Sequence, residues 1–217
     1  MDITGTDWYA KSMSFFCFLW IPLFYLFWRS ITGTNAASGG VLALLAGSIV
    51  ALLQFFLGAM VEPGGFGLSR WLSGCIDIVV LPAIAPLLIY LVLFSLKITT
   101  GTTDFANFAL LWLIPGGAIR ALTWSSQHDP ILLVLVPVLW TSIAIGAPFF
   151  ITIIQNSRVF AIIPASLAIL IVLFAAASSY WAFYSQKTFV GVLFLIAAVI
   201  PMFVSVILTL IKSGDTA

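Results

Sequence analysis

The chain has 217 residues, of which 63% are hydrophobic and only 7% are charged, whereas about a quarter of the residues are charged in an ordinary soluble domain. So few charges exclude a water-exposed shell around the chain, and the formal net charge of +1 provides no basic surface for nucleic acid. We therefore expect the lipid bilayer to surround most of the chain, and we expect no nucleic-acid partner.

Long apolar runs separated by short polar breaks indicate membrane-spanning helices, because a segment in lipid must pair all of its own backbone N–H and C=O groups. The alternating pattern of barrel strands is not visible. The candidate segments are 14–28, 40–60, 74–96, 105–124, 131–154, 159–184 and 189–211. We predict an all-α fold, a polytopic transmembrane helix bundle of six or seven spans that forms a single integral membrane domain over residues 1–217.

The first segment is predicted to be a retained helix. Asp2, Asp7 and only one basic residue, Lys11, precede its apolar run. The run ends in bulky Phe and Trp residues and lacks the small-residue cleavage site of a signal peptide.

The fourth segment decides between six and seven spans. Pro115, Gly116 and Gly117 interrupt its middle, and Arg120 follows within one turn. These residues are compatible with a full span, a half-helix or a re-entrant hairpin. Prolines also occur in most other segments, where each removes a backbone hydrogen bond, so we predict kinked helices.

Basic residues do not assign an orientation, because with seven spans each side receives four of them. One side holds Lys11, Arg70, Arg120 and Lys187, and the other holds Arg29, Lys97, Arg158 and Lys212.

Charges within the segments are candidate functional residues, because charge at membrane depth is costly. Asp77 lies just inside the third segment and Arg120 in the fourth. An Asp77–Arg120 ion pair inside the bundle would relieve both costs. The alternative is that each side chain reaches its own membrane interface, as Glu62 and Arg70 can.

Two Pro-Gly-Gly sequences resemble each other and suggest a candidate binding site. Gly64 and Gly65 precede Arg70, and Gly116 and Gly117 precede Arg120. Broken helices at matching positions are typical of transporter sites, where helix N-termini and an Arg can hold an anion. The alternative is chance recurrence in a chain with 16 Gly and 10 Pro.

The sequence predicts no cofactor and no metal site. Cys17 and Cys75 are far apart, and the lone His128 has no neighbouring Cys or His at metal-ligand spacing. His128 could act as a general base oriented by Asp129, but no nucleophile accompanies the pair at an informative spacing, and a polar turn closed by Pro130 explains the same residues without chemistry.

Two further features concern packing. Trp112 and Trp140 lie inside segments, where we expect lipid contact or core packing. Small residues cluster at 39–48 and along the sixth segment, which predicts close helix contacts within one chain or across a homodimer.

From Leu93 onward, the order of features resembles the bacterial branch of the Yip1 domain family. An apolar helix leads into a connection at 97–108, then into a short helix broken by Pro115, a helix pair, and an Asn156-Ser157-Arg158 break before an Ala-rich helix. The resemblance covers about half of the chain. It implies a compact bundle of about five helices, without catalysis in bacteria and with trafficking or scaffolding roles in eukaryotes. This chain departs from that pattern by one or two extra helices and by lacking a long N-terminal region.

The function that we predict from these observations is that of a non-catalytic membrane scaffold or a subunit of a larger complex. The main alternative is a small-solute or ion transporter with its site near the Pro-Gly-Gly sequences, and the third is a membrane-embedded enzyme that acts on lipid. We expect the bacterial cytoplasmic (inner) membrane as the location, because no targeting signal is visible.

Overall fold

The fold is that of a computed structural model, in which residues 3–33, 39–60, 71–72, 75–96, 102–123, 130–156 and 162–214 are described. Within these ranges, the side chains at 3–7, 57–60, 77, 81–83, 94, 102–104, 147–156, 162–165 and 212–214 lie outside the description.

Helices are the only regular secondary structure of the described residues, as the apolar runs predict. In chain order they are α1 (Ile3–Thr32), α2 (Gly40–Met60), the π-helix η1 (Ile76–Ile84), α4 (Ala85–Ser95), α5 (Thr102–Leu122), α6 (Ile131–Asn156), α7 (Ile162–Tyr184) and α8 (Thr188–Gly214). Each predicted segment corresponds to one of these helices, except the third, which contains both η1 and α4.

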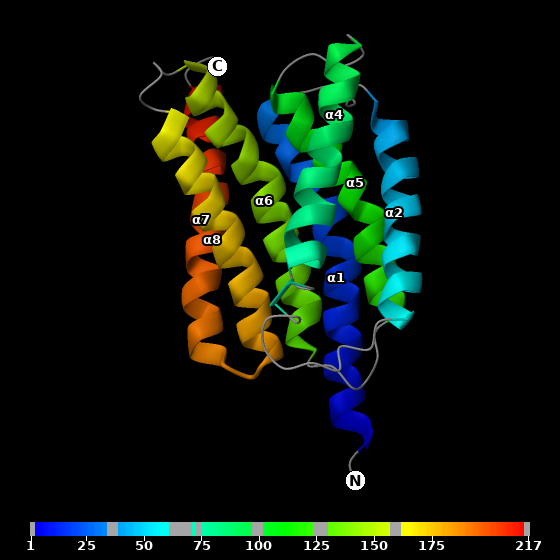
Figure 1. The fold of residues 1–217 in the computed structure, drawn as a ribbon. Helices are drawn as coiled ribbons and strands as arrows, with labels where there is room; N and C mark the ends of the chain where they lie inside the picture. The colour runs from blue at the N-terminus through cyan, green and yellow to red at the C-terminus, as the bar shows by residue number, and fades with distance from the viewer. Residues whose placement is uncertain are drawn as a thin grey trace.

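The helices form one bundle in which successive helical segments run in opposite directions, and the two termini lie at opposite ends (Figure 1). The centre of the bundle is the pair α5 and α6, which pack against each other. Helices α1, α2 and α4 also pack on α5, and α1, α7, α8 and η1 pack on α6. Continuous runs of buried residues, 105–113 in α5 and 139–146 in α6, reflect this central position.

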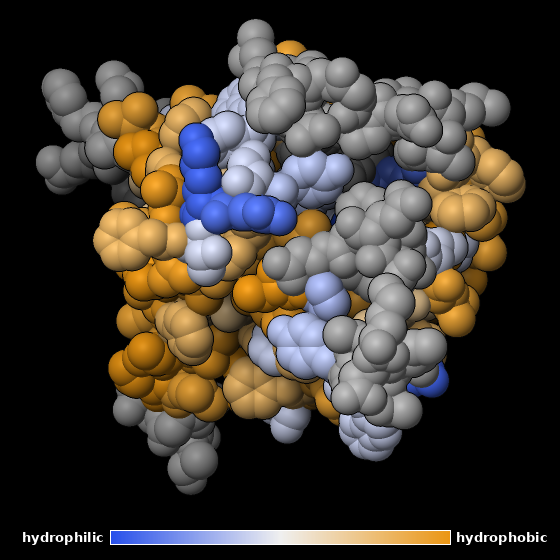
Figure 2. All heavy atoms as spheres, turned by 90° about the horizontal axis from the view of Figure 1, so that it is seen from below, coloured by the Kyte–Doolittle hydropathy of each residue, from blue (hydrophilic) through white to orange (hydrophobic). Residues whose placement is uncertain are grey.

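The outer helices turn large apolar side chains outward, as a bundle in lipid requires. Viewed from the end where the chain starts, hydrophobic residues surround much of the circumference and hydrophilic residues gather on the end face (Figure 2). Four of the described helical stretches are long and apolar enough to cross a membrane. These are Trp8–Thr32, Phe105–Leu122, Ser166–Tyr184 and Thr188–Ile211.

Helix α5 differs from the half-helix or hairpin that its Pro-Gly-Gly sequence allowed. It is one continuous α-helix with Pro115 inside it. The two glycines do not end the helix because packing of their flanks against neighbouring helices outweighs their weak helix propensity, a common tertiary effect.

The π-helix η1 is a feature that periodicity did not predict. Its wider turns are seen at the end of the element, where the backbone N–H of Ala85 donates to the carbonyl of Val80, five residues earlier. Pro82 and Pro86 interrupt the ordinary ladder here, because neither has an N–H to donate. A π-helix of nine residues is long for an element that mostly occurs as a single turn.

Candidate functional site

The predicted site residues divide into those that the structure describes and those that it does not. Gly116, Gly117 and Arg120 lie on one stretch of α5. Asp77 lies on η1, but its side chain is outside the description, so its pairing with Arg120 stays a prediction. The first Pro-Gly-Gly sequence and its neighbours, Glu62, Gly64, Gly65 and Arg70, lie outside the described residues, as does His128.

The two glycines of α5 are contact points for two different helices. A Cβ atom on Gly116 would lie 3.1 Å from the indole ring of Trp140 on α6. A Cβ atom on Gly117 would lie 3.0 Å from Cδ1 of Ile21 and 3.3 Å from the carbonyl oxygen of Cys17, both on α1. The two glycines of this sequence therefore leave room for the side chains of α6 and α1.

Arg120 lies one turn further along α5 and contacts the same tryptophan. Its guanidinium carbon is 5.4 Å from the centroid of the Trp140 ring, within the range of a cation–π interaction. The Trp140 side chain is only 2% exposed. Packing within the core is thus confirmed for Trp140, and also for Trp112, which is 3% exposed.

The contact region of α1, α5 and α6 around Gly117 and Trp140 is called the junction. Two side-chain hydrogen bonds fix α1 to it. The thiol of Cys17 donates to the carbonyl of Gly117 at 3.5 Å, and the indole N–H of Trp20 donates to the hydroxyl oxygen of Thr141 at 3.1 Å. The Thr141 hydroxyl itself donates back to the carbonyl of Pro137 in its own helix, 2.9 Å away. These bonds satisfy polar groups in a region that we place in the membrane, where an unmade bond is costly.

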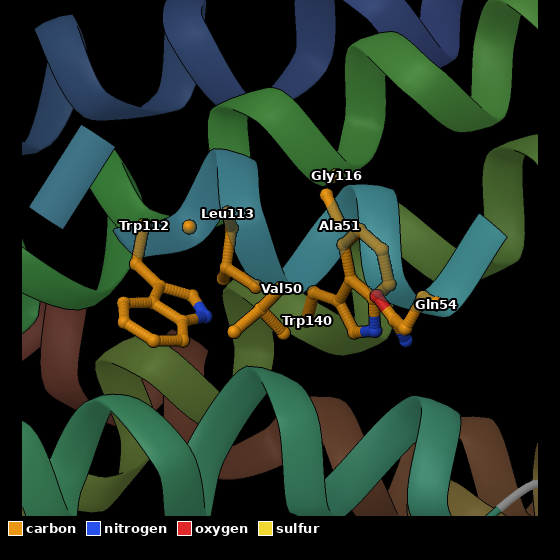
Figure 3. Close-up of a pocket in the computed structure, with 8 residues that line it drawn as sticks. Val50, Ala51, Gln54, Trp112, Leu113, Gly116 and Trp140 are labelled. Atoms are coloured by element: carbon orange, nitrogen blue, oxygen red, sulfur yellow. The ribbon is translucent and has the colours of Figure 1, made fainter. Parts of the chain in front are cut away.

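Helix α2 approaches the junction so closely that its contact residue has no room for a side chain. A Cβ atom on Gly47 would overlap the carbonyl oxygen of Trp112. Beside this contact, a small hollow with a cavity volume of about 10 Å³ lies among α2, α5 and α6 (Figure 3). One water molecule requires about this volume, so the hollow as it stands holds no larger solute. It is lined by Gly47, Val50, Ala51, Gln54, Trp112, Leu113, Gly116 and Trp140.

A second polar contact joins α6 and α8, and sequence reasoning missed it. Ser142 donates to the carbonyl of Ala198 at 2.5 Å, and Ser205 donates to the carbonyl of Ile145 at 3.3 Å. Between the two bonds, a Cβ atom on Gly146 would lie 3.1 Å from Cβ of Pro201. The available signal was the small residues at 142 and 146, one helical turn apart, a spacing typical of close helix contacts in membranes.

The described side chains include no group of three or more His, Cys, Asp or Glu residues that could bind a metal ion. The junction consists of indoles, glycines, a hydroxyl group, the Cys17 thiol and the Arg120 guanidinium. Such groups can hold helices together and can bind apolar or anionic groups.

Comparisons with known proteins gave no relative: no protein family, no curated protein and no solved structure matches the chain.

Proposed function

We propose that the protein is a non-catalytic, polytopic membrane protein that acts as a scaffold or as a subunit of a larger membrane complex. The observation that carries this proposal is the packing at Gly116, Gly117 and Arg120. Those residues of the predicted anion site that the structure describes are in contact with Trp140, Ile21 and the backbone of α1. Residues that pack against neighbouring helices in this way stabilise a rigid bundle.

The topology that we propose is seven crossings, with the chain ends on opposite sides of the membrane. The alternating helix directions support it (Figure 1). Three further described stretches are apolar but shorter: Gly40–Phe56, Ile78–Leu93, which runs through η1 and α4, and Ile131–Gly146. We propose that these three cross the membrane together with the four longer ones. The membrane that we propose is the bacterial cytoplasmic membrane, with lipid and either a second copy or other subunits as partners.

The resemblance to the Yip1 domain family supports the same proposal, because that family implies a helix bundle without catalysis in bacteria. We propose membership for the part of the chain from Leu93 onward. The features that carry the resemblance there include α5 and α6, the two central helices.

Thiol accessibility tests the scaffold proposal against a water-filled transport path. In a background with Cys17→Ser and Cys75→Ser, we place a single cysteine by Arg120→Cys and probe it from each side with a membrane-impermeant maleimide. A packed junction protects the thiol because α6 covers the position. The matched control is Thr123→Cys, an exposed position at the end of the same helix, which should react from one side.

Either result is decisive. Protection at position 120 together with reaction at 123 supports the scaffold. Reaction at both positions shows water at the junction and overturns the scaffold in favour of a transporter.

A small-solute or ion transporter is the second candidate, and η1 is the observation that favours it. π-Helical turns occur frequently at functional sites, and this one carries Asp77, an acidic residue within an apolar segment. A transporter requires Asp77 to be accessible to water, so reaction of a single cysteine introduced by Asp77→Cys would support it.

A lipid-acting enzyme is the third candidate. It depends on His128, which lies outside the described residues. Unchanged activity of the His128→Ala variant on a lipid substrate would contradict it.

A further inference from the structure

The hollow described above lies on a side of α5 that is bordered by two outer helices. Both α2 and α4 pack against α5, and both present large apolar side chains outward. On α2 these include Ile49, which is 60% exposed, and on α4 they include Leu88, which is 59% exposed. Where the bundle lies in a bilayer, hydrocarbon surrounds both of these faces.

The lining of the hollow suits a hydrocarbon chain. Figure 3 shows the two indoles, Trp112 and Trp140, on either side of Leu113 and Val50, with Gln54 next to Trp140. Apart from the Gln54 amide and the indole N–H groups, the side chains that line the space are apolar. The two glycines of the lining add no side-chain bulk, so the width depends on how closely the surrounding helices pack.

Aromatic contacts connect α4 to this hollow. Tyr90 on α4 packs against Phe105 and Phe108 of α5, with ring centroids 5.3 Å and 5.6 Å apart. Phe108 in turn lies 6.5 Å from Trp112, which lines the hollow. A displacement of α4 would therefore change the packing around Trp112.

The element that precedes α4 is η1, and its wide turns, Pro82 within it and Pro86 just after it weaken the helical ladder. η1 packs on α5, α6 and α7, whereas α4 packs mainly on α5 and on η1 itself. η1 is thus held in the bundle on several sides, whereas α4 depends largely on its contact with α5. A movement of α4 about η1 would uncover the part of α5 that Tyr90 contacts.

We infer that the hollow among α2, α5 and α6 is a lateral binding site for one acyl chain of a membrane lipid, and that it widens when α4 pivots on η1. The closed state has room for about one water, so entry of a chain requires this widening, as for a cryptic pocket. This inference is independent of the scaffold proposal, because scaffold and transporter alike can hold a lipid at this site.

The test uses the full chain in phosphatidylcholine nanodiscs that contain a phospholipid with a diazirine on its acyl chain. After illumination, peptide mass spectrometry locates the adducts. We expect adducts on Trp112, Leu113 or Trp140, which are each 3% exposed or less and do not touch bulk lipid in the closed state. Adducts on exposed residues of α8, such as Phe203, provide the internal reference.

Two matched variants assign the adducts to the hollow. Val50→Phe fills it and should lower the ratio of buried to reference adducts several-fold. Ile49→Phe places the same side chain on the outer face of α2 and should leave the ratio unchanged. Tyr90→Ala releases α4 and should raise the ratio, which provides a test even if Val50→Phe does not fold. Adducts confined to exposed residues, or a ratio unchanged in both Val50→Phe and Tyr90→Ala, would overturn the inference.

Discussion

Gly47 determines how closely α2 approaches α5. Its Cα lies against the backbone of Trp112, where any Cβ atom would overlap the carbonyl oxygen. Gly116 and Gly146 have a similar role at less extreme distances, each leaving room for a ring of the neighbouring helix, Trp140 and Pro201 respectively. At this scale the absence of a side chain is what stabilises the contact, because helices in lipid associate largely through close packing.

Gly47→Ala should therefore destabilise the bundle although alanine is the better helix former. The added methyl group must move α2 away from α5, and overpacking of this kind costs about 1–3 kcal/mol. Unfolding in mixed micelles by increasing SDS, followed by circular dichroism, measures the change. Ser48→Ala is the control, because its hydroxyl bonds only within α2 and its loss should cost no more than about 0.5 kcal/mol. Equal stability of Gly47→Ala and wild type would contradict the close approach.

The helices differ in how firmly they are held. α6 contacts helices on several sides and exchanges serine-to-carbonyl hydrogen bonds with α8. α4 has fewer neighbours, and its Leu88, Leu91 and Val92 are exposed while Tyr90 and Leu93 are buried against the bundle. Local opening requires less free energy where fewer buried contacts must be broken.

Hydrogen exchange should reveal this difference between elements. We expect the backbone amides of α4 to exchange faster than those of α6 in the wild-type protein. Tyr90→Ala should accelerate exchange in α4 further, because it removes the ring contacts with Phe105 and Phe108. Leu91→Ala changes a side chain that is 52% exposed, so it should have little effect. Equal acceleration by both variants would show that Tyr90 does not anchor α4.

The whole bundle has its two ends on opposite faces, which makes the topology testable (Figure 1). The two ends lie on opposite faces because α5 is one continuous helix. If the fourth segment turned back as a hairpin, the chain would cross the membrane one time fewer, and both ends would lie on the same side. The equal division of Lys and Arg between the two sides provides no independent orientation.

Reporter fusions determine on which side of the membrane each end of the chain lies. A fluorescent protein that matures only in the cytoplasm and a phosphatase that is active only outside it are each fused to the N-terminus and to the C-terminus. Seven crossings place the two ends on opposite sides, so each reporter should be active at one end only. Activity of the same reporter at both ends would indicate six crossings.

Much of the fold was predictable because hydrophobic length in lipid leaves little choice of structure. The segment 40–60 coincides with α2, and 131–154 differs from α6 by two residues at one end. The site was predictable only in part. The importance of Gly116, Gly117 and Arg120 was visible as a break in an apolar run, but their partners on α1 and α6 were not, because those residues are far away in the sequence.

The helical fold and the positions of most helices could be predicted from the apolar runs alone, because a segment in an apolar solvent must pair its own backbone groups, which is a local requirement. The structure was needed to show that α5 continues through Pro115, that the indole of Trp140 packs against Gly116 and Arg120, and that residues 76–84 form a π-helix. Those outcomes depend on which helix faces approach one another, and that is a property of the packed bundle rather than of any one segment.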